Sequence, residues 1–136
     1  MLKTIKVDKT TVLKHSDAFL QLCEQARSEV NEITVDELKD ELQSRAGLVL
    51  IDTRDLFELE EQGFILGAAH LSKGWLEADI HYLVSDKNTQ IVLYCGGGKR
   101  SLLAALQLKK MGYSKVRSLR GGFKAWKVSQ PVEHGI

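Results

Sequence analysis

The sequence contains few of the residues that mark several common classes of protein. Its two cysteines, Cys23 and Cys95, lie far apart and form no Cys-x-x-Cys pair, so neither a disulfide framework nor a zinc site is indicated. The four histidines are scattered without ligand spacing. We therefore expect no metal and no cofactor. Basic and acidic residues nearly balance, 19 against 18, so no overall field attracts nucleic acid.

Long apolar runs are also missing. The longest purely aliphatic run, residues 48–51, is far too short to span a bilayer, and the start of the chain has no signal-peptide-like apolar stretch. A chain of 136 residues with 43% hydrophobic and 27% charged residues can bury one core. We expect one globular unit, in the cytoplasm, without a membrane partner.

The most informative stretch surrounds Cys95. Residues 91–94 form a short, β-branched apolar run typical of a buried parallel strand, and residues 101–111 have the composition of a helix that packs on a sheet. Cys95 therefore lies at a strand-to-helix turn. Charged residues follow another strand-like run at 48–52, where Asp52 and Arg54 would lie at the same carboxyl edge and share a crevice with Cys95.

The turn after Cys95 predicts a cradle for a thiolate or an oxyanion. Consecutive glycines let the backbone N–H groups point inward, and the positive end of the following helix dipole points at the same place. Two cations at the end of the glycine run add local positive charge, which favours the thiolate, the reactive form of cysteine. The candidate binding residues all lie in this turn: Gly96, Gly97, Gly98, Lys99, Arg100 and Ser101.

Helical and strand-like patterns alternate along the rest of the chain. Helical patterns occur at about 17–30, 35–44, 55–62, 74–83 and 101–111, with a helical turn at 123–126. Strand-like runs occur at 48–52, 68–71, 91–94 and 116–119. This alternation predicts an α/β fold with a mainly parallel sheet and helices on both faces.

At these positions the sequence resembles the rhodanese family of sulfurtransferases over about residues 33 to 128. The matching residues occur in family order: 51–54, Glu58, Gly63, 67–68, 94–101, 111–113, 121–122 and Trp126. The resemblance implies a five-stranded parallel sheet in a rhodanese-like domain at 33–128. It leaves 1–32 as an N-terminal extension that carries the first helix, and 129–136 as a C-terminal tail.

The resemblance also implies a mechanism by double displacement. The Cys95 thiolate would attack the outer sulfur of thiosulfate or of a persulfide donor, hold that sulfur as a persulfide, and pass it to cyanide or a thiol. The partners expected are thus a small anionic sulfur donor or a protein that carries a persulfide, and a thiophilic acceptor. Lys99 and Arg100, at the end of the loop, favour the doubly charged thiosulfate over a keto acid.

Several residues keep two interpretations. Arg100 either contacts the substrate or braces the loop by pairing with Asp52 or an acid of the 58–61 run, while Lys99 is the expected direct contact with an anion. Arg54 either faces the crevice or only pairs with Asp52. Cys23 is expected to face the core, with a resolving thiol for Cys95 as the alternative.

Three further positions are given structural roles. Trp75 and Trp126 are expected in the core or in a pocket wall, and His70 is read as structural. The family usually has Gly-His where this chain has Gly63-Phe64, which predicts a packing change.

Two other functions compete with sulfur transfer. A phosphatase or arsenate reductase also uses a thiolate in a basic loop, but phosphatase loops place five residues between cysteine and arginine, whereas Cys95 and Arg100 enclose four. The second alternative is a slow persulfide carrier or a partner-binding module that docks through the helix at 17–30.

Overall fold

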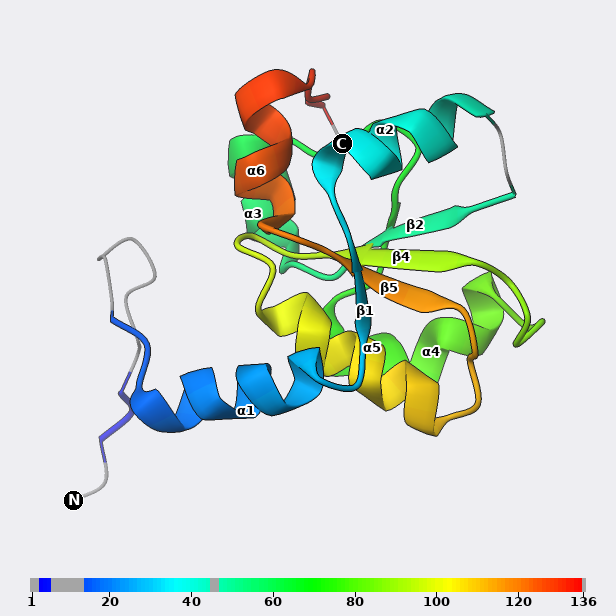
Figure 1. The fold of residues 1–136 in the computed structure, drawn as a ribbon. Helices are drawn as coiled ribbons and strands as arrows, with labels where there is room; N and C mark the ends of the chain where they lie inside the picture. Colours follow the sequence, from blue (N-terminus) through cyan, green and yellow to red (C-terminus); the bar gives the residue numbers. More distant parts are fainter. Residues whose placement is uncertain (1–2, 6–13, 45–46, 136) are drawn as a thin grey trace.

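A sheet of five parallel strands runs through the centre of the computed structural model, which describes residues 3–5, 14–44 and 47–135. The strands lie in the order β1-β5-β4-β2-β3, and every neighbouring pair is parallel (Figure 1). Their bounds are β1 (Asn31–Ile33), β2 (Val49–Asp52), β3 (Ala69–His70), β4 (Ile91–Tyr94) and β5 (Val116–Leu119). The five-stranded parallel sheet implied by the sequence is confirmed.

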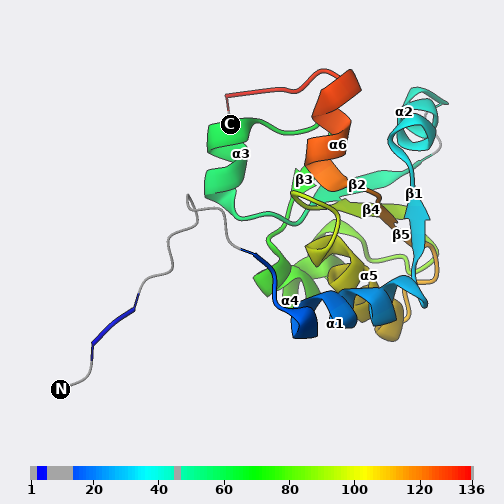
Figure 2. The same ribbon diagram turned by 60° about the vertical axis from the view of Figure 1, so that its left-hand side comes forward.

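Helices cover both faces of this sheet. Figures 1 and 2 show α1, α4 and α5 on one face and α2, α3 and α6 on the other. Their bounds are α1 (Asp17–Arg27), α2 (Val35–Ser44), α3 (Leu56–Gln62), α4 (Lys73–Leu83), α5 (Arg100–Lys110) and α6 (Gly122–Ser129). The predicted α/β layering is therefore confirmed, and within the described ranges none of these helices is long and apolar enough to cross a membrane.

The central strand β4 is buried on both faces. Ile91 and Leu93 join the core under α1, α4 and α5, while Val92 and Tyr94 join the core under α2 and α6. Alternate residues of a strand point to opposite faces, so one run of four apolar residues serves both cores. The turn that follows Tyr94 is thereby attached to the best-packed strand of the sheet.

Local capping signals correctly mark where two helices begin. The Ser16 side chain accepts a hydrogen bond from the amide of Phe19 at the start of α1 (3.1 Å). Thr34 and Glu37 form the reciprocal capping box of α2, with distances of 3.0 and 3.2 Å. Helix α1 ends at Arg27, earlier than the predicted residue 30, because the chain then enters β1.

Three features differ from the sequence expectations. Strand β1 was not predicted, because three residues are too few for a periodic signal and its pairing with β5 is nonlocal. Helix α6 has eight residues, where only a helical turn at 123–126 was expected. Trp75 is 65% exposed rather than in the core, because the buried stripe of α4 consists of Leu76 and Ile80, whereas Trp126 is 5% exposed.

Parts of both segments that flank the predicted domain, 33–128, pack against it. Helix α1 lies along α5 and buries Cys23 and Ala26. At the other end, Phe64 and Glu133 form a two-bond antiparallel bridge (2.9 and 2.8 Å). A Cβ atom at Gly63 would lie 2.9 Å from the ring of His134, so this ring occupies space beside the glycine.

Candidate active site

The Cys95 loop connects β4 to α5 at the carboxyl edge of the sheet. It begins directly after Tyr94 and ends where α5 starts at Arg100. The amide of Phe123 donates to the Cys95 carbonyl (2.8 Å), and the amide of Lys124 donates to the Gly96 carbonyl (3.0 Å). The first turn of α6 therefore holds the first two residues of the loop in place through their carbonyl groups.

Three hydrogen-bonding groups surround the sulfur of Cys95. The backbone amides of Gly98 and Ser101 donate to Sγ at 3.2 and 3.3 Å, and the Ser101 hydroxyl lies 3.4 Å away. Gly98 has a φ of 90°, a left-handed conformation that glycine adopts without strain. Of the inward N–H groups expected from the glycine run, the one at Gly98 points at the sulfur, and Ser101 of α5 supplies a second amide.

The glycines of the loop serve different purposes. A Cβ at Gly96 would lie 3.1 Å from Nη2 of Arg100, so this position makes room for the guanidinium. Gly97 is exposed, and a Cβ there would meet nothing within 4 Å. Of the three glycines, Gly98 is the one whose amide lies on the sulfur.

Gly122 allows α6 to approach the loop closely. Its φ is 60°, and a Cβ there would lie 2.6 Å from the Cys95 carbonyl oxygen and 2.7 Å from the Gly98 nitrogen. Distances this short exclude any side chain. Gly122 is therefore a steric requirement of the cysteine loop, whereas a Cβ at Gly121 would lie 2.6 Å from Cβ of Ala125 in α6.

Arg100 is held by Glu58 of α3. Nη1 and Nη2 of the arginine donate to Oε2 and Oε1 of Glu58 at 3.0 and 2.9 Å, and Oε2 also accepts from the Asp55 amide at 2.9 Å. Burial raises the pKa of Glu58, but the bonds from Arg100 and Asp55 lower this pKa by more, so it lies below its usual value. This pairing agrees with the bracing interpretation of Arg100.

Asp52 and Arg54 form a fully buried ion pair. Nη2 of Arg54 donates to Oδ2 of Asp52 at 2.7 Å and to the Gly63 carbonyl at 2.8 Å, and the guanidinium lies 4.2 Å from the ring centre of Phe123. Both side chains have no exposed surface. This burial agrees with the interpretation in which Arg54 only pairs with Asp52, and not with the one in which Arg54 faces the crevice. The pair connects the end of β2 to α6 and to the turn after α3.

Lys99, the last loop residue before α5, has no ion-pair partner among the described residues, unlike Arg54 and Arg100. Its carbonyl lies 4.0 Å from Sγ of Cys23 on α1. Burial raises the pKa of the Cys23 thiol, which keeps this group protonated, although nearby Lys99 opposes the shift. The core-facing interpretation of Cys23 is confirmed.

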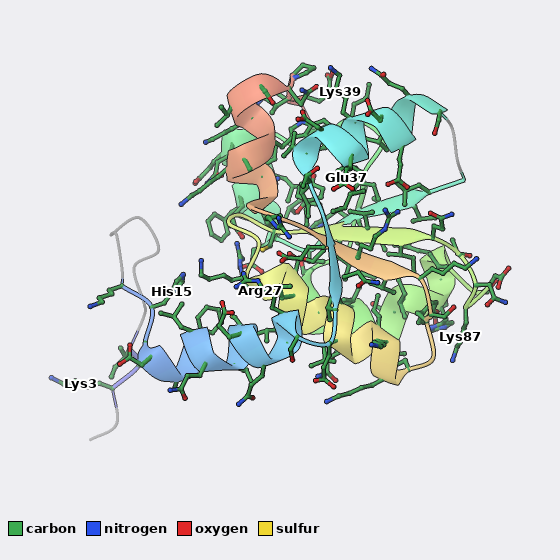
Figure 3. All side chains as sticks on the ribbon, in the orientation of Figure 1. Lys3, His15, Arg27, Glu37, Lys39 and Lys87 are labelled. Carbon is green, nitrogen blue, oxygen red and sulfur yellow. The ribbon has the colours of Figure 1, made fainter. Side chains whose placement is uncertain are left out.

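A cluster of charged side chains links α1 to β1 and to the residue that follows β5. The Glu32 carboxylate lies 3.2 Å from Nε of Arg27 and 3.6 Å from Nε of Arg120, the residue before the double glycine. Figure 3 shows Arg27 on the side of α1 that faces the sheet.

His70 contacts the Arg54 carbonyl through Nε2 (2.7 Å), in keeping with a structural role.

The family assignment rests on a match over most of the chain. A family model described as the rhodanese-like domain matches residues 34–129. The chain belongs to the rhodanese-like family. A sulfurtransferase of Allochromatium vinosum is 34% identical over 107 residues, which cover 79% of this chain and 92% of that protein. The thiosulfate sulfurtransferase GlpE of Coxiella burnetii is 35% identical over 92 residues, covering 68% of this chain and 83% of that protein.

Two further relatives have names that bear on the function. YrkF of Bacillus subtilis, named as a candidate sulfur carrier, is 31% identical over 73% of this chain, but the match spans about half (52%) of that protein. A solved structure from Rhodopseudomonas palustris, of a protein of unknown function described as a possible tyrosine phosphatase, has a TM-score of 0.80 and 28% identity. The matched region covers 90% of this chain and 99% of the chain in that structure.

Sequence reasoning missed two parts of the site. Glu58 was one of several acids offered as partners for Arg100, and its capping box with Asp55 was not recognised. Ser118 was not considered, although its hydroxyl lies 2.8 Å from that of Ser101. Because β5 also contains the polar Arg117, the sequence of this strand holds no distinct signal for Ser118.

Proposed function

We propose that the chain is a sulfurtransferase that moves a sulfane sulfur from thiosulfate, or from a persulfide donor, to a thiol or cyanide through a persulfide on Cys95. The observation that carries this proposal is the set of polar groups at Sγ: two backbone amides that donate to it and one hydroxyl, all within 3.4 Å. Relatives named as sulfurtransferases support sulfur transfer in general.

In the first step the Cys95 thiolate attacks the outer sulfur of thiosulfate. The new S–S bond forms as the bond between this sulfur and the sulfonate sulfur breaks, and sulfite leaves with the bonding electron pair. The terminal sulfur then carries the negative charge, so the donors around Sγ serve the persulfide anion as well as the thiolate. An acceptor nucleophile removes this sulfur and regenerates the thiolate.

Lys99 is the residue that we propose for contact with the anionic donor. Glu58 already neutralises Arg100 and Asp52 neutralises Arg54, whereas Lys99 is half-buried at the end of the loop and has no ion pair in the described part of the chain. An unpaired cation attracts a dianion more strongly than an arginine with a carboxylate partner does.

The decisive experiment measures the mass of the intact protein after incubation with thiosulfate. We expect a gain of one sulfur atom that cyanide removes and that Cys95→Ser never shows, while Cys23→Ser shows it in full. Wild-type protein that gains no sulfur from thiosulfate or from glutathione persulfide would overturn the proposal.

Phosphate chemistry is the second candidate, favoured by the relative described as a possible tyrosine phosphatase. The loop argues against it. Cys95 and Arg100 enclose four residues rather than five, and the Arg100 guanidinium is occupied by Glu58. We expect no turnover of p-nitrophenyl phosphate or arsenate under conditions where thiosulfate loads Cys95; turnover at a comparable rate would reverse the order of the two candidates.

A slow carrier is the third candidate, supported by the name of the YrkF relative. Helix α1, the proposed docking element, uses one face against α5 and leaves Leu22 51% exposed. Repeated turnover with thiosulfate and cyanide separates the two roles. A carrier loads one sulfur per chain and releases it slowly, whereas an enzyme cycles many times.

A further inference from the structure

A second hydroxyl lies behind the Ser101 hydroxyl that faces the Cys95 sulfur. Oγ of Ser118 on β5 is 2.8 Å from Oγ of Ser101, and Ser101 Oγ is 3.4 Å from Sγ. Both serines are fully buried, with no exposed surface. The three groups form a chain that runs from the reactive sulfur into the core between α5 and β5.

The direction of the hydrogen bond between the two serines decides whether the Cys95 sulfur faces the proton or a lone pair of the Ser101 hydroxyl. Each hydroxyl has one proton to donate. If Ser118 donates to Ser101, the Ser101 proton remains available for Sγ. If Ser101 donates to Ser118, a lone pair of Ser101 faces the sulfur and repels a thiolate.

We propose that Ser118 is a positioning residue for sulfur transfer, whose hydroxyl donates to Ser101 and thereby fixes the Ser101 proton on the Cys95 sulfur; this inference rests on the proposed function. A buried hydroxyl requires a hydrogen-bond partner, and Ser101 is the partner of Ser118 within the described residues. A thiolate or persulfide anion at Cys95 selects the arrangement in which both serines donate toward it.

In this arrangement the Ser101 hydroxyl is a third donor to the Cys95 sulfur, beside the backbone amides of Gly98 and Ser101. Backbone amides are fixed by the fold, whereas a serine hydroxyl rotates freely unless a partner holds it. The role of Ser118 is therefore to remove this freedom before the donor arrives. Preorganised donors are worth more to an anionic intermediate than donors that must reorient.

The test compares variants that differ only in a hydroxyl at position 118. Ser118→Thr and Ser118→Val add side chains of the same shape, and only threonine keeps the hydroxyl. Ser118→Ala, the smaller variant, covers the case in which the larger ones do not fold. Each is followed by the single-turnover rate of sulfur gain from saturating thiosulfate and, at one fixed pH, by the rate at which iodoacetamide labels Cys95 in the absence of any donor.

We expect Ser118→Val and Ser118→Ala to gain sulfur and react with iodoacetamide more slowly than wild type, by up to about tenfold, because the upper limit is complete loss of the Ser101 hydrogen bond to a charged group. Ser118→Thr should recover most of both rates. Equal rates for threonine and valine, or a wild-type rate for alanine, would overturn the inference. Because alkylation needs no sulfur donor, it tests Ser118 even if wild-type protein gains no sulfur, an outcome that would overturn the proposed function alone.

Discussion

Arg100 and Glu58 meet through two parallel hydrogen bonds, Nη1 to Oε2 at 3.0 Å and Nη2 to Oε1 at 2.9 Å. The arginine belongs to the cysteine loop and the glutamate to the first turn of α3, so the pair connects two segments at the carboxyl edge of the sheet. A bidentate pair fixes orientation as well as distance. Loss of this pair should therefore change the shape of the cysteine loop more than it changes the charge of the loop.

Glu58→Gln tests this relationship. Glutamine keeps the size of the side chain but removes the charge that holds Arg100, so we expect the rate constant for sulfur gain to fall about tenfold. The concentration of thiosulfate that gives half the maximal rate should fall as well, because the released guanidinium attracts the dianion. Single-turnover kinetics over a range of thiosulfate concentrations measures both quantities.

The matched control is Glu41→Gln. Glu41 forms a bidentate pair with Arg117 at 2.7 and 2.8 Å, between α2 and β5 and away from the loop. This variant should lose stability but keep wild-type kinetics. A similar loss of rate in both variants would mean that Glu58 acts only through general stability.

The Glu41 pair also predicts how stability depends on pH. The hydrogen bond from Arg117 lowers the pKa of Glu41 below its usual value, with burial opposing. A carboxyl whose pKa is lower in the folded state stabilises the fold above the unfolded pKa of about 4.3 and loses this effect as the pH falls through the folded value.

Urea unfolding from pH 3 to pH 7 should therefore show a difference between wild type and Glu41→Gln of about 1 kcal/mol near neutral pH that shrinks in acid. Glu60→Gln, which removes the same charge from an exposed residue of α3 without an ion pair among the described residues, is the control for the change of charge itself. A difference for Glu41→Gln that stays constant with pH would contradict the assignment.

Gly122→Ala tests the contact between α6 and the loop. The new methyl group would lie 2.6 Å from the Cys95 carbonyl oxygen, so α6 must move away from the loop. We expect a loss of more than about 2 kcal/mol of stability and nearly complete loss of sulfur gain. Thermal unfolding and the mass measurement check the two effects.

Gly67→Ala separates steric contact from backbone strain. Gly67 has a φ of 86°, but a Cβ there meets nothing within 4 Å. Alanine at this position should cost only the strain, about 1 kcal/mol, and should leave sulfur gain unchanged. If both glycine variants behaved alike, strain alone would explain the requirement at position 122.

Cys23→Ala examines the second thiol. Its sulfur is buried against the Lys99 carbonyl, and burial raises the pKa of the thiol. We expect a stability loss of about 1 kcal/mol from the small cavity, with sulfur gain and its removal by cyanide unaffected. A variant that gains sulfur normally but cannot release it to a thiol would instead support a resolving role for Cys23.

The main features of the fold were predictable because their signals are local. The apolar run before Cys95, the glycines after it and the capping residues at Ser16 and Thr34 are each read within a few positions. Strand β1 was missed because its signal is its pairing with β5, more than eighty positions away. The exposed Trp75 was misplaced because hydrophobicity alone does not say which side of a helix faces the core.

The central residues of the site were predictable from the sequence, but the residues that pair with them were not. Cys95 and the loop donors are neighbours in the sequence, whereas Glu58 lies 42 positions from Arg100, and Ser118 lies 17 positions from Ser101. Which acid of the 58–61 run meets Arg100 depends on how α3 is oriented against the loop. Tertiary packing decides that orientation, and the spacing of residues in one chain does not encode it.

The strand order has a consequence for how the protein loses activity. Strand β4, which carries Cys95, has two strands on each side, so the fraying of either edge of the sheet leaves its hydrogen bonds intact. Its amides should be among the slowest in the chain to exchange with deuterium, since they open only when the whole sheet does. Heat should therefore inactivate the protein and unfold it in the same transition, with no earlier stage in which a native-like sheet carries a collapsed cysteine loop.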